Sequence, residues 1–237
     1  MTVRLAVVLS LLLNLVTLAG VVALAWPPGN VFLLFWCENV VLGLCTLVRV
    51  ATARAVDAPG ARSRLRFTVN DREVAPPSSR AGYVAFFGLH CGIFCVVHLV
   101  FTVVVAVLVG TETSWLFLGL PVVLVLVRYG VELASTWFGS DGLRGQTSPG
   151  RAMMQPYPRI VVLQLGVIVG FALVLVGSFG RTGGGTDPFD RATRLLEPVL
   201  ALLPAGRTGL GVLAVGFLLL VKTVVDVLTT RRALRAG

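Results

Sequence analysis

Two histidines inside one apolar stretch are the first residues of this chain that could do chemistry. His90 and His98 lie in the sequence FFGLHCGIFCVVHLVF, residues 86–101, and they are the only histidines of the chain. Eight residues make about two turns of an α-helix, so we expect both imidazoles on one helix face, about 12 Å apart. Ionisable groups inside an apolar segment are costly, and they therefore mark a candidate functional site.

Carboxylate and amide groups in other apolar segments would complete such a site. Glu38 and Asn39 stand side by side in the sequence FWCENVVLG, and Gln164 is the strongly polar residue of a later apolar segment. Imidazole and carboxylate together suit a divalent metal ion, which makes His90, His98 and Glu38 candidate metal ligands. The same groups suit a proton or a small polar ligand, and about 12 Å between the histidines is too far for both to bind one ion comfortably.

Two pairs of opposite charges lie within apolar segments at the spacing that lets them meet on a helix. Arg128 and Glu132 are four residues apart, and so are Lys222 and Asp226. We predict that both pairs face the interior of a helix bundle. An alternative interpretation is structural: the polar groups of the spans only hold helices together in an accessory membrane protein, as is normal in membrane bundles.

Known catalytic motifs are missing from the sequence. It contains no GxSxG, no HExxH and no P-loop. Since no nucleophile or cofactor motif accompanies the polar groups, a binding or structural role is favoured over an enzymatic one. The cofactor is unknown, and a divalent metal ion is the candidate.

The composition points to a lipid environment. Hydrophobic residues make up 56% of the 237 residues and charged residues only 13%, and the mean hydropathy is +0.90. Ordinary globular chains carry about 25% charged residues, so a water-soluble fold could not hide this much apolar surface. The net charge of +9 comes from arginines beside apolar segments, which favours anionic-lipid contact over nucleic-acid binding.

Six apolar segments predict an all-α bundle of six membrane-spanning helices within one integral membrane domain, residues 1–237. Each segment has the length that crosses the hydrocarbon core. The first also resembles a signal peptide, but its apolar run is longer than a signal core and a second span follows at once. The predicted spans are residues 5–25, 31–50, 83–109, 115–138, 158–179 and 208–228.

The connecting segments predict the orientation. Residues 51–80 form an Arg-rich loop with a candidate short strand at RLRFTV, and residues 188–203 read as a short amphipathic helix at the membrane surface. With both termini in the cytoplasm, fourteen arginines, Arg49 among them, lie inside and four lie outside, as the positive-inside rule demands. That orientation places Glu38, Asn39 and His98 in the outer half of the membrane and His90 near its middle. The inner half receives Arg128, Glu132, Gln164, Lys222 and Asp226.

Small residues complete the pattern. Gly166 and Gly170 form a GxxxG motif, which lets helix backbones approach closely and more often serves packing within one chain than dimerisation. The sequence leaves the oligomeric state open.

The four cysteines lie in apolar segments and read as small buried thiols. They are Cys37, Cys45, Cys91 and Cys95.

Three stretches together resemble an uncharacterised family of multi-pass membrane proteins of bacteria and archaea, known only as a domain of unknown function. They are FWCENVVLG at residues 35–43, the histidine stretch at residues 86–101, and PYPRIV at residues 156–161. The resemblance implies a prokaryotic plasma-membrane location and a histidine where this chain has Gln164. It also implies that the family's motif positions are Glu38, Asn39, His90, His98 and Arg159.

Overall fold

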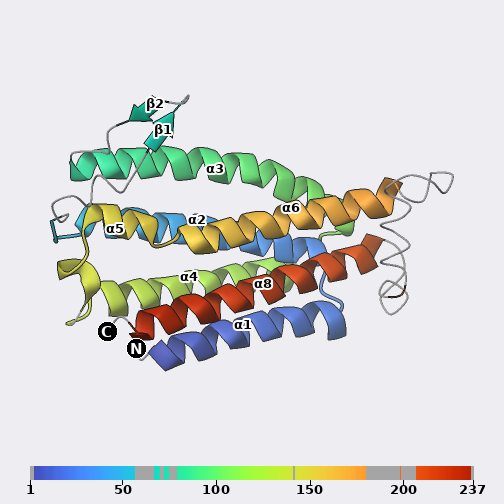
Figure 1. Ribbon diagram of the computed structural model, residues 1–237. Helices are drawn as coiled ribbons and strands as arrows, with labels where there is room; N and C mark the ends of the chain where they lie inside the picture. The colour runs from blue at the N-terminus through green and yellow to red at the C-terminus, as the bar shows by residue number, and fades with distance from the viewer. Residues whose placement is uncertain are drawn as a thin grey trace. The chain divides into compact units, whose positions relative to one another are not determined.

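The computed structural model describes residues 3–56, 67–69, 72–74, 79–140, 142–179, 198 and 207–235. The chain folds as an all-α helical bundle, with one small hairpin beside the helices in the described part (Figure 1). The predicted surface helix at 188–203 falls, apart from residue 198, outside the described residues.

The helices follow the predicted apolar segments closely. The main ones are α1 (Val3–Ala23), α2 (Pro28–Thr52), α3 (Arg80–Val109), α4 (Leu120–Glu132), α6 (Tyr157–Phe179) and α8 (Arg207–Arg235). Helix α4 continues the π-helical turn η2 (Trp115–Gly119) and runs into a second one, η3 (Leu133–Trp137). The strand predicted at RLRFTV is present as β1 (Phe67–Val69), which pairs antiparallel with β2 (Arg72–Val74).

Four helical stretches of the described chain are long and apolar enough to cross a membrane. They are Pro28–Thr52, Arg80–Val109, Trp115–Trp137 and Pro149–Ala172. Helices α1 and α8 contribute shorter described apolar stretches, Asn14–Ala23 and Gly211–Val225. Because only described residues enter this comparison, the crossing by α1 and α8, and with it the count of six, stays a prediction.

Helix ends follow local sequence rules. Pro28 starts α2, where its missing N–H costs nothing, and Gly110 stops α3 with a positive φ of 97°, which glycine adopts without strain. Between the predicted spans 115–138 and 158–179, the chain forms the turn η4 (Leu143–Gly145) and the helix α5 (Pro149–Met154). The signal for α5 is Ser148, whose hydroxyl accepts a hydrogen bond from the Arg151 N–H ahead of a proline-initiated turn.

The chain divides into two compact units, each with its own apolar core. Unit 1 is formed mainly by Asn39–Val96 and Val125–Tyr157. Unit 2 is formed by Thr2–Glu38, Val97–Leu124 and Pro158–Gly237. The core of unit 1 is built around Tyr83, Phe87, Trp137 and Met153. The core of unit 2 is built around Phe32, Phe35, Val105, Val167, Val215 and Leu218.

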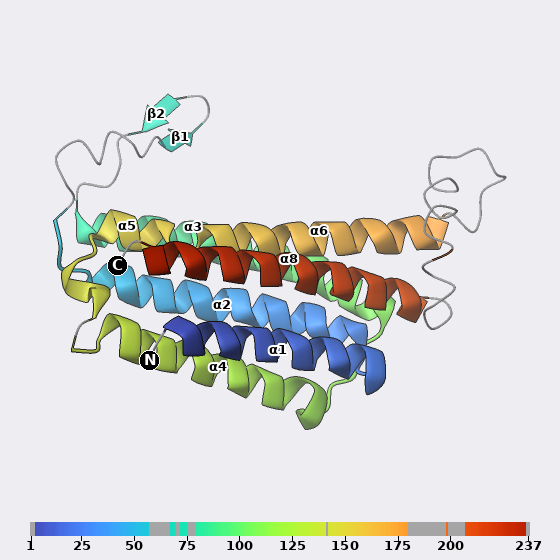
Figure 2. The same ribbon diagram turned by 60° about the horizontal axis from the view of Figure 1, so that its bottom comes forward.

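Within unit 2, α8 packs against helices from the N-terminal part of the chain. Helices α1 and α8 lie side by side (Figures 1 and 2). At the start of α8, a Cβ on Gly211 would lie 2.8 Å from the Cβ of Pro28, the first residue of α2. A contact between the two helix starts means that this part of α2 and α8 begin at the same end of the unit.

The GxxxG motif serves packing within the chain. A Cβ on Gly170 would lie 2.8 Å from the Phe32 ring of α2, and a Cβ on Gly166 would collide with the Leu218 side chain of α8. Both glycines are buried, so they allow α6 to approach α2 and α8 closely. The interpretation of this motif as intrachain packing is therefore confirmed.

Asn30 joins the start of α2 to the chain that links α3 to α4. Its side-chain amide donates to the Glu112 carbonyl at 2.7 Å, and its side-chain oxygen accepts from the Glu112 N–H at 3.0 Å. The neighbouring Gly29 N–H donates to the Gly110 carbonyl at 2.9 Å. Asn30 is thus a buried polar side chain whose groups are satisfied by backbone, as a dry interior requires.

We expect Gly166→Ala to destabilise the protein, because the added methyl group must displace Leu218. Overpacking of this kind costs about 1–3 kcal/mol. Thermal unfolding in detergent, followed by circular dichroism, measures the change. Gly216→Ala in α8 is the matched control, since no side chain lies within 4 Å of the Cβ it adds. Equal melting temperatures for the two variants would contradict the close packing of α6 on α8.

Candidate functional site

A buried ion pair between α2 and α8 is the principal polar feature of unit 2. The Lys222 Nζ lies 3.2 Å from the Glu38 Oε2, and the two residues are 5% and 2% exposed. Charged side chains this deeply buried are rarely found unless they are paired. Glu38, a candidate site residue from sequence, therefore lies inward and has a cationic partner.

Lys222 has further partners besides the carboxylate. Its ammonium group donates a 2.8 Å hydrogen bond to the Asn14 Oδ1 of α1, and it lies 5.3 Å from the centroid of the Phe35 ring. The Asn14 amide nitrogen donates in turn to the Thr223 hydroxyl at 3.1 Å. A carboxylate, an amide oxygen and an aromatic face thus surround one ammonium group, and all three stabilise positive charge.

The helix geometry explains why these residues meet. From the contact of Gly211 with Pro28, Lys222 lies eleven residues along α8 and Glu38 ten residues along α2. At about 1.5 Å per residue the two positions are at nearly the same level of parallel helices. The prediction that Glu38 and Lys222 belong to separate polar layers is therefore wrong, because the depth estimate ignored this parallel register.

The second histidine is also buried in unit 2. His98 is 3% exposed, and the side chain of Gln164 on α6 lies beside it. Thr102 follows His98 by one turn of α3 and is fully buried, and its hydroxyl has no hydrogen-bond partner in the described part of the chain. The structure thus brings together His98 and Gln164, two residues that the sequence assigned to different halves of the membrane.

Asn39 is buried in unit 1. It is 3% exposed, and neither its amide nitrogen nor its amide oxygen hydrogen-bonds to a residue that the structure describes. A buried amide in that position is costly, so Asn39 remains a candidate site residue.

His90 does not share the buried face of His98. It is exposed, its ring stacks on Phe86 with centroids 5.8 Å apart, and it lies 6.3 Å from the Tyr157 ring. Eight residues advance about 800° around a helix, which leaves the two histidines about 80° apart. The expectation of one shared face is therefore wrong.

The described residues give no support for a metal centre. Among the described residues, no group of three or more His, Cys, Asp or Glu side chains is arranged to hold a metal ion. His90, His98 and Glu38 are all described, so the structure gives the three-ligand hypothesis no support. None of the four cysteines forms a disulfide.

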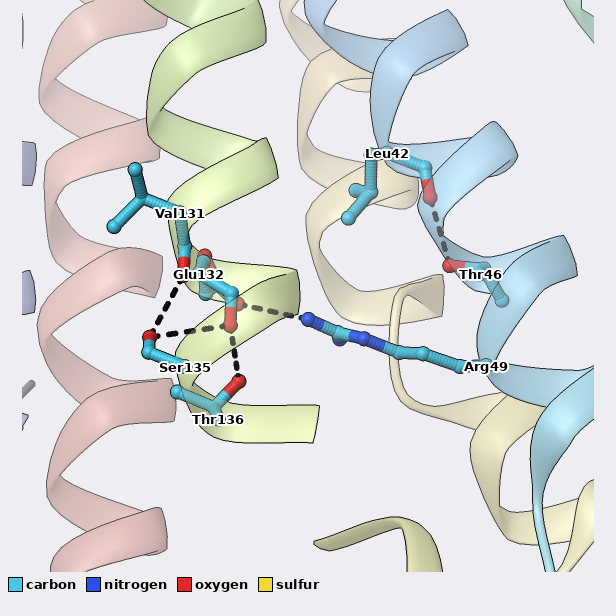
Figure 3. Close-up of polar contacts among 7 residues, drawn as sticks. All are labelled: Leu42, Thr46, Arg49, Val131, Glu132, Ser135 and Thr136. Carbon is cyan, nitrogen blue, oxygen red and sulfur yellow. Dashed lines mark hydrogen bonds and ion pairs between the residues drawn. The ribbon is translucent and has the colours of Figure 1, made fainter. Parts of the chain in front are cut away.

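A second ion pair lies in unit 1 between α2 and α4 (Figure 3). The Arg49 Nη2 lies 3.1 Å from the Glu132 Oε1. The hydroxyl of Thr136 donates to the Glu132 backbone carbonyl at 2.6 Å, within the π-helical turn η3. Glu132 is thus a half-buried carboxylate, and its partner across the helices is an arginine that the sequence interpretation used only to set orientation.

The two predicted charge pairs within single helices stay predictions. The Arg128 guanidinium lies 5.1 Å from the centroid of the neighbouring Tyr129 ring. The side chain of Asp226 lies outside the described residues. Arg159 is half-buried near the start of α6.

Sequence reasoning missed the partners more than the charges, although Asn14, near the middle of the first predicted span, was expected to be able to join either polar layer. Asn14, Phe35 and Thr223 complete the surroundings of Lys222, and Arg49 completes those of Glu132. The available signal was Asn14, because an amide near the middle of an apolar helix needs a hydrogen-bond partner.

We expect the Glu38–Lys222 pair to show strong coupling in a double-mutant cycle. Lys222→Met leaves the Glu38 carboxylate buried without its cation, and breaking such a pair costs about 3–5 kcal/mol in soluble proteins. The double variant Glu38→Gln/Lys222→Met removes both charges and should cost less than Lys222→Met alone. Detergent unfolding of the four proteins measures the coupling.

Glu112→Gln combined with Lys222→Met is the matched control for that cycle. Glu112 is exposed, so its neutralisation should change stability little and should not rescue Lys222→Met. Additive effects of Glu38→Gln and Lys222→Met would contradict the pairing.

Comparison with known proteins assigns a family. Searches of curated proteins and of solved structures found no match to the chain. The model of a family of unknown function, DUF6498, matches residues 1–237. Because that match covers the whole chain, this protein belongs to the DUF6498 family of unknown function.

Proposed function

We propose that this chain is an integral membrane protein whose buried Glu38–Lys222 pair binds a proton. The observation that carries the proposal is the 3.2 Å contact between a lysine and a glutamate that are both almost fully buried. Four helical stretches in the described part of the chain are long and apolar enough to cross a membrane, which supports the lipid environment. Ionisable residues at that depth mark proton relays and ion paths in membrane proteins.

The surroundings of Lys222 favour Glu38 as the group that takes up the proton. When Glu38 is protonated, the ammonium group keeps the Asn14 oxygen at 2.8 Å and the Phe35 ring as partners. Protonated Glu38 also remains able to donate or accept hydrogen bonds. The site would thus alternate between an ion pair and a neutral Glu38 carboxyl beside Lys222, whose contacts with Asn14 and Phe35 are kept.

A proton suits this site better than a metal ion. The described residues offer no cluster of three metal-binding side chains. The site already contains a cation, and Lys222 would repel a second one next to Glu38. Proton binding needs only one carboxylate whose charged and neutral forms are both stabilised. Lys222 would stabilise the charged form of Glu38, and hydrogen bonding would stabilise the neutral form.

Infrared difference spectroscopy of the protein in lipid vesicles, between alkaline and acidic buffers, tests this proposal. A protonated carboxyl has a C=O stretch distinct from that of a carboxylate. We expect acidification to produce a carboxylic-acid band that is missing from Glu38→Gln. Glu112→Gln, which removes an exposed carboxylate, is the matched control and should retain the band.

Identical spectra for wild type and Glu38→Gln throughout the titration would refute proton binding at Glu38. That result would favour the structural alternative, in which the pair and Asn14 only join α1, α2 and α8. This measurement therefore distinguishes proton binding from a purely structural role of the pair.

A further inference from the structure

Helix α3 carries a stripe of exposed side chains that no described residue covers. Its members are spaced three and four residues apart, which is the heptad spacing of a coiled-coil seam. They are His90, Ile93, Val97, Val100, Val104 and Val107, all exposed. Because α3 is a single helix, this spacing places them in one line along it. The apolar members need no partner in a membrane, since lipid tails solvate them.

His90 is the member that lipid cannot satisfy. Its ring faces Phe86 and Tyr157, but no hydrogen bond joins its nitrogens to any residue of the described chain. It lies ten residues after Arg80, the first residue of α3, which is about 15 Å along the helix axis. With Arg80 at the membrane surface, the imidazole lies in the hydrocarbon region, where an unmet donor and acceptor are costly.

We propose that this stripe of α3 is the interface of a parallel dimer, and that the occupant is a second copy of this chain. Two copies inserted in the same orientation are related by a two-fold axis along the membrane normal. Their α3 helices then run parallel, so each position near the axis meets its own counterpart. His90 therefore meets His90 of the partner subunit at the same depth.

Imidazole is chemically suited to this pairing. A neutral ring carries one donor and one acceptor nitrogen, so His90 and the partner's His90 satisfy each other with a direct hydrogen bond. A single polar residue in an otherwise β-branched seam also fixes the register of the two helices. Acyl chains have no hydrogen-bond donor or acceptor to offer His90. A second copy has both, at the same depth in the membrane, and for that reason we choose it as the occupant.

The neighbouring stripe of α3 provides the internal comparison. Leu89, Val96 and Val103 are also exposed, but that line of residues contains no polar group. No residue on that line favours contact with a protein helix over contact with lipid. Val96 and Val97 are 65% and 52% exposed and point about 100° apart around the helix, so they distinguish the two faces at the same depth.

Cysteine cross-linking in lipid vesicles tests the interface. All four native cysteines are buried or half-buried, so the wild-type chain gives the background. We expect Val97→Cys to form an intermolecular disulfide several-fold faster than Val96→Cys under the same mild oxidation. Equal rates, or a faster reaction at Val96→Cys, would overturn the proposal, because random collisions depend on exposure and not on the face.

The role of His90 has its own test. Donor- and acceptor-labelled copies are mixed in vesicles at increasing lipid-to-protein ratio, and energy transfer gives the dimer dissociation constant. We expect His90→Leu to weaken the dimer about 3- to 15-fold, the range of interhelical hydrogen bonds in membranes. His90→Asn, which keeps a donor and an acceptor, should stay near wild type. A dimer that His90→Leu leaves unchanged would refute the pairing of the two imidazoles. This proposal does not depend on proton binding at Glu38.

Discussion

A dry, apolar interior offers a buried polar group no hydrogen bonds from water, and this constraint explains most of the polar geometry of the protein. Each charge or amide in an apolar helix needs a partner from another helix, or it destabilises the bundle. Glu38 meets Lys222, Glu132 meets Arg49, and Asn14 joins Lys222 to Thr223. These contacts join helices that are distant in sequence, so they determine which helices can be neighbours.

The two ion pairs differ in ways that separate their roles. The Glu38–Lys222 side chains are 3% and 6% exposed, whereas those of Arg49 and Glu132 are 13% and 21% exposed. Solvent or lipid headgroups can screen the charges of the Arg49–Glu132 pair, as expected for an arginine near a helix end. The first pair depends on protein groups alone, and a change of protonation there would change the energy of the whole site. For that reason the proposed function rests on Glu38 and not on Glu132.

Apolar length and pattern were enough to predict the helices. The spans predicted at 31–50 and 83–109 correspond to α2 and α3, and the GxxxG packing of Gly166 and Gly170 followed from residue size. The predicted inward position of Glu38 also holds, because a carboxylate facing lipid is too costly. These features depend on the local sequence and on the surrounding medium. Both can be inferred from the residues of a single chain.

Partner choice could not be predicted, because it depends on rotation and register between helices. The i, i+4 spacing suggested Asp226 as a partner of Lys222, a pairing that stays a prediction, and it gave no sign of Glu38, which Lys222 contacts across to α2. Counting turns from His90 to His98 suggested a shared face, but the accumulated rotation of about 80° exposes one and buries the other. Propensity and hydropathy contain no information about which helices are adjacent, so the buried cluster emerged only from tertiary structure.

Lys222 and Glu38 form a buried ion pair, and the composition of the chain allows a direct test of their contact. Lys222 is the sole lysine of the chain, so its ¹⁵N-labelled side chain gives one assignable signal. Solid-state NMR dipolar recoupling in lipid bilayers measures the distance from that nitrogen to ¹³C-labelled glutamate carboxyls. We expect one strong coupling, at a separation set by the 3.2 Å contact, which disappears in Glu38→Gln. A lysine nitrogen with no glutamate carboxyl coupling, or one that survives in Glu38→Gln, would contradict the account.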